Sequence, residues 1–263
     1  DSNLTRGDHT VVNPKVCVVI PTSDEAENLP ELVTKLFSLE LPFLRLIIVD
    51  DASPDGTGDI ADSIAETHQG QIQVLHRPLK TGIGPAYVAG FKAALKIKPD
   101  IIVQMDADLS HPPHAIPMML NEFESADVVI GSRYVVGGSI DTGWGWRRRV
   151  LSWCGNTYLR AVAGILVRDA SSGFKVFRRE VIESIPLESL QCKGFGFQAE
   201  VAMACQMLNL NVSEFPIQFT DRQKGVSKIS WSIVLEALWR LPFIRIRTFT
   251  NSTTEVHCHY RER

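Results

Sequence analysis

The chain has 263 residues, of which 44% are hydrophobic and 22% charged, and its formal net charge is −3. This length and composition fit one large α/β domain, or one domain with a small appendage, with a sizeable core. A net charge so close to zero argues against general nucleic-acid binding, and we expect no nucleic-acid partner.

Short apolar runs alternate with amphipathic segments along the first half of the chain. The runs predict strands, and the segments between them, several with a proline near the start, predict helices. This alternation is typical of an α/β fold with a mostly parallel central sheet. The predicted strands cover residues 16–20, 45–49, 72–76, 101–105 and 128–131, and the predicted helices cover about 25–39, 57–67, 84–97 and 113–124.

The pattern changes after Tyr134 to a loop rich in glycine and tryptophan, residues 135–146. A helix that opens with residues 147–149, all arginine, is expected to follow. Glycine can act as a hinge, and tryptophan can close over a sugar or lie at a lipid interface, which favours a mobile cover. An ordinary surface connection is the alternative.

The two ends of the chain are polar and lack periodicity. We expect a disordered tail at residues 1–13, the main domain at 14–228, an amphipathic membrane-proximal helix at 229–250, and a second disordered tail at 251–263. A helix packed on a soluble core is equally compatible with the pattern near the C-terminal end. We find no apolar segment of the roughly 20 residues that a membrane-spanning helix needs. Five cysteines without a C-x-x-C pair favour reduced thiols and a cytosolic location.

Acidic residues follow three of the predicted strands. Asp106 and Asp108 come after the strand at 101–105, Asp50 and Asp51 end the strand at 45–49, and Glu25 follows the first strand. Because the carboxyl ends of parallel strands meet at one edge of a sheet, these side chains are expected to line one ligand crevice.

The pair Asp106 and Asp108 predicts a cation site. Side chains two positions apart leave a strand on the same side, and two carboxylates suit Mg²⁺ or Mn²⁺, which take their other ligands from water and substrate phosphates. The alternative is a helix cap, in which Asp108 or Ser110 accepts backbone N–H bonds. The second acidic pair, at the end of a neighbouring predicted strand, favours the cation site.

Basic residues in the predicted loops could complement such a metal by binding a substrate with several phosphates. Taken singly, each is more often a solvated surface residue. The sequence lacks a complete G-x-G-x-x-G, a P-loop and a G-x-S-x-G, which disfavours a dehydrogenase, a P-loop NTPase and an α/β-hydrolase. The basic candidates are Arg77, Lys80, Arg133, Arg147, Arg148, Arg149, Arg222, Lys224 and Lys228.

An ordered series of motifs from about Val16 to Ser230 carries a family resemblance. The chain resembles the dolichol-phosphate mannose synthases and their polyprenyl-phosphate relatives in glycosyltransferase family 2. That resemblance implies a GT-A-type, Rossmann-like fold, with residues 14–228 as the glycosyltransferase domain. Family members usually have Tyr-Asn where this chain has Ser23-Asp24. The matching segments are 20–22, 25–29, 50–57, 105–113, 131–134, 171–174, 196–200, 221–222 and 225–228.

The resemblance also implies roles for individual residues. Asp106 and Asp108 would act as catalytic residues that hold the metal, with Gln198 as a third protein ligand. Arg133 and Arg148, also catalytic, would bind the acceptor phosphate, and Arg222 and Lys228 would clamp the donor diphosphate. The nucleotide sugar would contact Pro21, Ser23, Glu25, Val49, Asp51, Asp106, Ala107, Asp108, Ser110, Arg222 and Lys228.

The function implied is transfer of mannose from GDP-mannose to dolichyl or polyprenyl monophosphate, with inversion and with Mg²⁺ or Mn²⁺. An anionic acceptor needs no general base, and His111 and His114 are interpreted as loop or second-shell residues. We expect a peripheral enzyme at the cytosolic membrane face, with a membrane-anchoring subunit as a further candidate partner. The alternatives are the same reaction with UDP-glucose or another donor, and a non-catalytic nucleotide- or lipid-surface-binding module.

Overall fold

The computed structural model describes residues 13–141, 143–221, 240 and 243. Within this part, seven strands form a central sheet in the order β3-β2-β1-β4-β7-β5-β8, and β6 and β9 form a second, two-stranded sheet. All paired strands are parallel except β7, which is antiparallel to both neighbours, so the predicted mostly parallel α/β sheet is confirmed. The strands are β1 (Val16–Thr22), β2 (Leu44–Asp50), β3 (Ile72–His76), β4 (Ile101–Gln104), β5 (Val128–Ser132), β6 (Ser139–Ile140), β7 (Lys175–Arg178), β8 (Val212–Pro216) and β9 (Gln218–Phe219).

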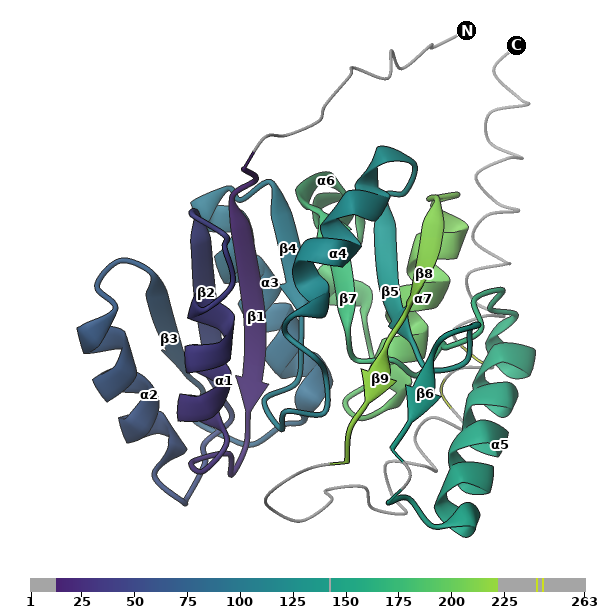
Figure 1. Cartoon of the computed structure of the whole chain (residues 1–263), viewed down its shortest axis with the longest axis horizontal. Coiled ribbons are helices and arrows are strands. Elements are labelled where there is room, and N and C mark those ends of the chain that lie inside the picture. Colours follow the sequence, from purple (N-terminus) through teal and green to yellow (C-terminus); the bar gives the residue numbers. More distant parts are fainter. Residues whose placement is uncertain (1–12, 142, 222–239, 241–242, 244–263) are drawn as a thin grey trace, which may run out of the picture.

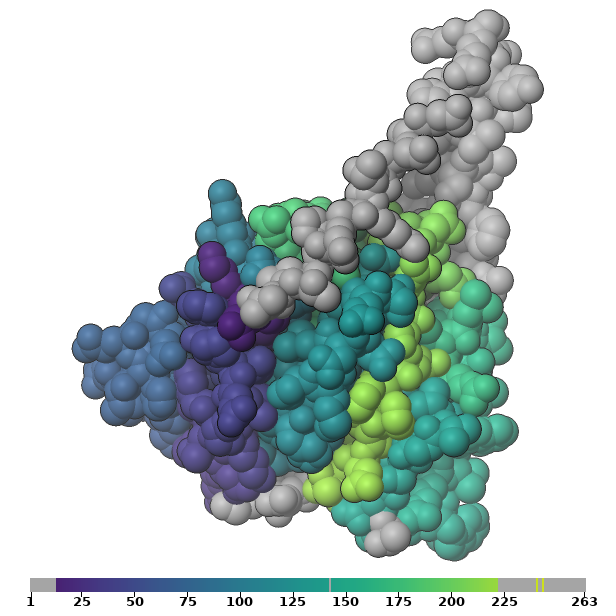
Figure 2. Space-filling view, turned by 45° about the horizontal axis from the view of Figure 1, so that its top comes forward, coloured from purple at the N-terminus to yellow at the C-terminus, as the bar shows by residue number. Residues whose placement is uncertain are grey.

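Helices cover both faces of the central sheet (Figure 1). One face packs against α1, α2 and α4, and the other packs against α3, α6, α7 and the C-terminal part of α5. Figure 2 shows the α1 and α4 segments side by side over the first of these faces. The helices are α1 (Leu29–Phe37), α2 (Thr57–Thr67), α3 (Ile83–Ile97), α4 (Ala115–Asn121), α5 (Trp146–Ala163), α6 (Arg179–Ser184) and α7 (Gly196–Met207), with short 3₁₀ turns η1 (Glu122–Glu124) and η2 (Leu187–Ser189).

Side-chain alternation in β1 explains why both faces are covered. Cys17 and Val19 belong to the core beneath α3 and α7, whereas Val16, Val18 and Ile20 belong to the core beneath α1 and α4. A strand buried on both faces has to be apolar throughout, which is the pattern of the predicted strands. The strand order β2-β1-β4 reverses direction at β1. Open α/β sheets bind ligands beyond the carboxyl ends of the strands at such a reversal, so we call the region beyond the ends of β1 and β4 the crevice.

The predicted elements of the first half of the chain are confirmed to within a few residues. The first helix begins later than predicted, at Leu29, because residues 25–28 form a turn in which the N–H of Asn28 bonds to the carbonyl of Glu25. The predicted helix at 113–124 is divided into α4 and η1. The loop at 135–146 contains β6, which pairs with β9.

Among the described helices, none combines the length and the apolar character that a membrane crossing requires. The predicted tails at 1–13 and 251–263 and the predicted helix at 229–250 lie outside the described residues, except for Asn13, Arg240 and Phe243.

Candidate functional site

The ends of β1 and β2 carry several of the residues predicted to bind a nucleotide. Pro21 and Val49 are register partners in these adjacent strands, and both are buried. Glu25 is buried just beyond β1, where its Oε2 accepts a hydrogen bond of 2.7 Å from Nδ2 of Asn28. These residues therefore lie together at the crevice, while their roles stay predictions.

The carboxylate of Asp51 is held by three donors. Its Oδ1 accepts a 2.6 Å bond from Nη1 of Arg77 and a longer one, 3.4 Å, from the N–H of Thr81, and its Oδ2 accepts a 3.1 Å bond from the N–H of Gly82. Because the Asp51 side chain is only 5% exposed, this ion pair is little screened by water. The network joins the end of β2 to the start of α3. The neighbouring carboxylate of Asp50 accepts hydrogen bonds from the Thr22 hydroxyl at 3.3 Å and from the Ser53 N–H at 3.2 Å. These two bonds orient the Asp50 side chain.

The loop after β4 places the two predicted metal ligands. Oδ1 of Asp106 accepts a 2.6 Å bond from the hydroxyl of Tyr87, and Oδ1 of Asp108 accepts a 3.1 Å bond from the N–H of Ser110. Between Asp108 and Ser110, Leu109 has a φ of 62°, a left-handed conformation that costs a non-glycine residue about 1 to 2 kcal/mol. Neither Asp108 nor Ser110 caps α4, whose N-cap residue is His114. The helix-cap interpretation of this pair is therefore wrong.

His111 is buried in the same loop as a partner of the backbone. Its Nδ1 accepts a 3.3 Å bond from the N–H of Asp106, so the proton of the neutral ring lies on Nε2. Burial lowers the pKa of His111, although the carboxylates of Asp106 and Asp108 oppose that shift. A neutral imidazole committed to a backbone contact is a poor general base, which agrees with the interpretation of His111 as a second-shell residue.

The space beside Asp106 depends on Gly173. A Cβ at Gly173 would lie 2.7 Å from Oδ2 of Asp106 and 3.1 Å from Cε1 of His111, too close for any larger residue without displacing the carboxylate. Glycine thus leaves room for a second oxygen of Asp106 at the crevice. Two carboxylates in this setting fit a divalent ion of the Mg²⁺ or Mn²⁺ type.

Among the described residues, no group of three or more His, Cys, Asp or Glu side chains gathers into a metal site. Gln198 is buried at the start of α7, where its Oε1 accepts hydrogen bonds from Nε2 of Gln104 and, at 2.8 Å, from Nζ of Lys175. These donors occupy both lone pairs of the amide oxygen. The role of Gln198 as a third ligand stays a prediction. For Oε1 to bind a metal, it would have to lose its hydrogen bond to Gln104 or to Lys175.

Arg133 forms a buried, bidentate ion pair with Asp169. Nε and Nη2 of Arg133 each lie 2.8 Å from one carboxylate oxygen of Asp169, and the backbone N–H of Arg133 adds a 3.0 Å bond. Burial alone would raise the pKa of Asp169, but the Arg133 guanidinium and these bonds lower it. The guanidinium is therefore fixed at the end of β5, with Nη1 as the edge that makes no hydrogen bond within the described residues.

Lys175 is a fully buried cation in β7. Its Nζ donates to the carbonyl oxygen of Ser172 and to Oε1 of Gln198. Burial lowers the pKa of Lys175 to about 8, with the charge of Asp169 opposing the shift. The cation thus lies near the carboxylates of Asp169 and Asp106.

Arg148 approaches the site from the first turn of α5. Its Nη1 lies 2.9 and 3.0 Å from the two carboxylate oxygens of Asp221, and its Cζ lies 3.8 Å from the centre of the Trp144 ring. Trp144 is buried, whereas Trp146 is exposed. The two tryptophans of this loop therefore have different environments.

The remaining predicted site residues divide into two groups. Ala107 and Ser110 are buried in the loop after β4, and Ser23 is partly buried after β1. Arg222 and Lys228 lie outside the described residues.

Sequence reasoning missed Tyr87, Asp169, Lys175 and Phe219. Asp169 lies two residues before the matched segment 171–174, and this position was the only available signal. Tyr87, Lys175 and Phe219 do not lie in the segments where acidic residues follow a predicted strand. Only their contacts across the fold place them at the site.

Comparisons with known proteins identify the family of the chain. A family model described as Glycosyl transferase family 2 matches residues 17–185. The chain is 41% identical to a polyprenol monophosphomannose synthase of Mycolicibacterium smegmatis, over 89% of each chain. It is 40% identical to an undecaprenyl-phosphate mannosyltransferase of Micrococcus luteus, over 85% of this chain and 91% of the relative.

Solved structures show the same fold at low sequence identity. The glucosyl-3-phosphoglycerate synthase of Mycobacterium tuberculosis in complex with UDP superposes with a TM-score of 0.62 at 17% identity, covering 87% of this chain and 79% of that one. A mannosyltransferase from Pyrobaculum calidifontis in complex with GDP-mannose and Mn²⁺ superposes with a TM-score of 0.54 at 18% identity, covering 84% of this chain and 59% of that one. The predicted GT-A-type architecture is confirmed.

Proposed function

The chain belongs to glycosyl transferase family 2 and is a glycosyltransferase, and from that premise we propose that it transfers mannose from GDP-mannose to a dolichyl or polyprenyl monophosphate. Support for the mannosyl group and the lipid phosphate comes from the relatives of 40–41% identity, whose names state both. GDP as the carrier is supported by the GDP-mannose complex of the Pyrobaculum mannosyltransferase.

The observation that carries the proposal is the closeness of the predicted donor side of the site, with Asp106 and Asp108, to the predicted acceptor side, with Arg133. The His111 ring, bonded to the backbone of Asp106, lies 5.6 Å from the Phe219 ring, and Cζ of Arg133 lies 5.1 Å from that same ring. A carboxylate pair suited to a metal and a fixed arginine suited to a phosphate are therefore linked through one aromatic ring, which supports a shared site. This is what transfer between a diphosphate donor and a monophosphate acceptor requires.

On the donor side, Asp106 and Asp108 would hold Mg²⁺ or Mn²⁺. When bound, such an ion offsets the charge that develops on the departing diphosphate. Arg222 and Lys228 would complete the diphosphate site. The N–H of Thr220 donates a 3.3 Å bond to the carbonyl of Ser110, so the chain just before residue 222 lies beside the loop after β4.

The nucleoside would lie against the ends of β1 and β2. Pro21 and Val49 would offer apolar contacts, and the carboxylates of Glu25 and Asp51 are suited to hydroxyl or amino groups. Ala107 and Ser110 would contact the nucleotide from the loop after β4. Ser23, where the family resemblance implies tyrosine, would leave less stacking surface for the base.

On the acceptor side, Arg133 and Arg148 would bind the lipid phosphate. Nη1 of Arg133 offers the phosphate an edge that its pairing with Asp169 leaves unused. A phosphate oxygen would form a bond to the anomeric carbon as the bond from that carbon to the diphosphate oxygen breaks, with inversion. The acceptor is already anionic, so no proton has to be removed before attack.

The acceptor would be reached from the cytosolic face of a membrane. Exposed apolar side chains on α5 lie next to exposed arginines, a composition suited to an anionic lipid surface. The predicted helix at 229–250 and a membrane-anchoring subunit are further proposed contributors. The α5 residues concerned are Trp146, Arg147, Arg149, Val150, Leu151 and Trp153.

A donor screen tests the proposal. The purified chain is incubated with Mn²⁺ or Mg²⁺, a polyprenyl phosphate in detergent, and GDP-mannose or UDP-glucose, and release of GDP or UDP is measured with the lipid product. We expect GDP release, dependent on both metal and acceptor. UDP release with UDP-glucose alone would establish the alternative donor, and nucleotide binding without turnover of either donor would favour the non-catalytic module.

A further inference from the structure

Two aromatic side chains lie between the two arginines of the acceptor site. Cζ of Arg133 lies 5.1 Å from the Phe219 ring centre, and Cζ of Arg148 lies 3.8 Å from the Trp144 ring centre. The two rings are 5.8 Å apart with an interplanar angle of 85°. Arg133, Phe219, Trp144 and Arg148 therefore form a continuous row of cation–π and edge-to-face contacts, which we call the aromatic bridge.

Phe219 is fixed within the aromatic bridge by its backbone and its ring. It pairs with Ile140 in the sheet formed by β6 and β9, and its carbonyl accepts a 2.9 Å bond from the N–H of Asp141. Its ring also meets the buried His111 ring at 5.6 Å. Backbone pairing and ring contacts thus set the position against which Trp144 packs.

Trp144 is held by contacts of its ring. Its Nε1 is buried and has no hydrogen-bond partner among the described residues. A buried donor without a partner is destabilising, and phenylalanine would avoid that cost. The face of the Trp144 ring contacts the guanidinium of Arg148, and indole gives the strongest cation–π contact of the aromatic side chains. This contact explains why position 144 is tryptophan.

Arg148 depends on these contacts for its orientation. Its side chain is 46% exposed, so a free arginine at this position would sample many rotamers. The Trp144 face and the Asp221 carboxylate fix the plane of the guanidinium from two directions. In turn, the N–H of Asp221 donates a 3.2 Å bond to Oδ2 of Asp141, in the segment that pairs with Phe219.

We propose that Trp144, supported edge-on by Phe219, is a positioning residue that orients Arg148 toward the phosphate monoester of the lipid acceptor. The proposal rests on the proposed function for the identity of that ligand. It assigns the aromatic bridge to acceptor affinity and leaves donor binding to the other half of the site.

The test measures binding of geranyl phosphate, a water-soluble prenyl phosphate, by titration calorimetry, and of GDP with Mn²⁺ in parallel. We expect Trp144→Leu to weaken geranyl phosphate binding roughly 3- to 10-fold and Phe219→Leu to weaken it in the same direction. Phe219→Tyr retains an aromatic ring and should restore binding. Affinity for GDP should remain within about 2-fold in each variant. Phe43→Leu, the same substitution at an exposed position before β2, is the matched control.

A double-mutant cycle separates positioning from general stability. In an Arg148→Ala background, Trp144→Leu should cause no further loss of geranyl phosphate affinity, because the residue through which it acts is gone. Trp144→Phe, which keeps a ring, is measured in the same cycle in case Trp144→Leu does not fold. Equal losses in both backgrounds, or unchanged affinity in Trp144→Leu and Phe219→Leu, would overturn the inference.

The same measurements distinguish this inference from the proposed function. If wild-type protein binds geranyl phosphate with the expected pattern of variants but transfers no mannose, the proposed function fails and the inference stands. If transfer occurs but the variants do not change acceptor affinity or acceptor KM, the inference fails alone.

Discussion

The hydroxyl of Tyr87, buried in α3, donates a 2.6 Å hydrogen bond to Oδ1 of Asp106 at the crevice. Burial and the neighbouring Asp106 carboxylate raise the pKa of Tyr87 well above its ordinary value, so the hydroxyl stays protonated as a donor. The phenol ring is itself fixed by stacking on Phe197 at 5.7 Å. The helix face beneath the sheet therefore sets the orientation of a predicted metal ligand.

Removing that hydroxyl should weaken metal binding. We expect Tyr87→Phe to reduce Mn²⁺ affinity about 10-fold, because a ligand that loses its hydrogen-bond partner is less well oriented. Titration calorimetry with Mn²⁺ alone measures the change. Tyr158→Phe, the same substitution near the C-terminal end of α5, serves as the control, and equal affinities in the two variants would contradict the role of Tyr87.

Asp108 should be required for transfer and dispensable for folding. Its carboxylate accepts a bond from the backbone N–H of Ser110, and losing such a bond should cost about 1 kcal/mol of stability in Asp108→Ala. Loss of a metal ligand should reduce kcat by about three orders of magnitude. Turnover and urea denaturation are measured together, with exposed Asp59→Ala as the control. Full activity in Asp108→Ala would show the proposed mechanism to be wrong.

Adding one methyl group beside Asp106 should displace it. Gly173→Ala would bring a Cβ to 2.7 Å from Oδ2 of Asp106, and we expect Mn²⁺ affinity to fall about 10- to 100-fold. Gly155→Ala is the matched control. A Cβ at Gly155 meets nothing within 4 Å, so this substitution in α5 should raise stability by about 1 kcal/mol and leave Mn²⁺ affinity unchanged. Normal metal binding by Gly173→Ala would mean that the carboxylate can move without loss.

The buried pair of Asp169 and Arg133 should make stability depend on pH. Asp169→Asn leaves the Arg133 guanidinium buried without its counter-charge and should cost about 3 kcal/mol at pH 7. Because folding lowers the pKa of Asp169 below 3.8, this difference should keep its full size above about pH 4 and shrink as the pH falls through the folded-state pKa.

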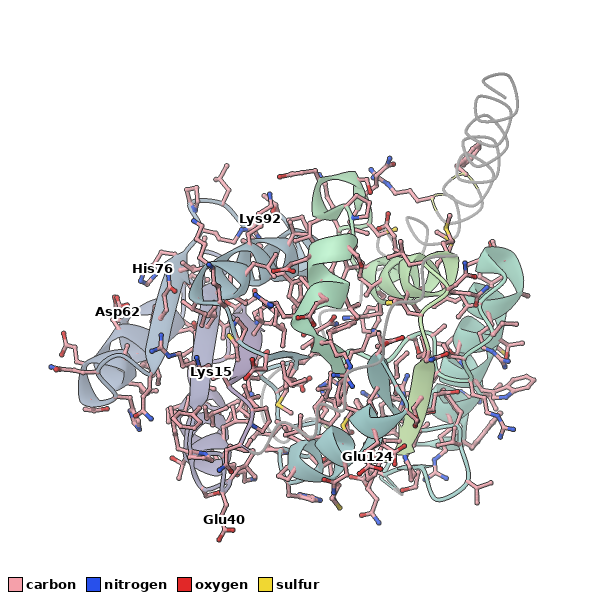
Figure 3. The ribbon with its side chains drawn as sticks, turned by 90° about the horizontal axis from the view of Figure 1, so that it is seen from above. Lys15, Glu40, Asp62, His76, Lys92 and Glu124 are labelled. Carbon is pink, nitrogen blue, oxygen red and sulfur yellow. The ribbon has the colours of Figure 1, made fainter. Side chains whose placement is uncertain are left out.

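Urea denaturation of wild-type protein and Asp169→Asn from pH 7 to pH 3 measures that difference. The control is Asp62→Asn, which removes the carboxylate charge from the exposed contact between Asp62 and His76 at the β3 edge of the sheet (Figure 3). Exposed pairs contribute at most about 1 kcal/mol. A difference for Asp169→Asn that stayed constant down to pH 3, or a cost no larger than that of the control, would contradict a stabilising buried pair.

Local pattern was sufficient for much of the fold. The apolar runs before Asp50 and Asp106 predicted β2 and β4, and the alternation with helical segments predicted the parallel sheet. The same pattern put both aspartates at one edge, because parallel strands end on the same side. The strand β7 was not predicted. Lys175 interrupts its apolar run, and only the fold supplies the buried oxygens of Ser172 and Gln198 that bond to this cation.

The sequence by itself determined which residues are apolar, acidic or basic and in what order, and this order fixed the α/β class, the acidic pair after β4 and the arginines near β5 and α5. Only the tertiary structure decided their partners: Asp169 for Arg133, Tyr87 for Asp106, and Trp144 with Asp221 for Arg148. The periodicity of apolar residues predicts which residues are buried, because burial depends on the face of its own strand or helix that a residue occupies. A partner many residues away is set by strand order and by which loops meet at one edge, and these depend on the packing of the whole chain.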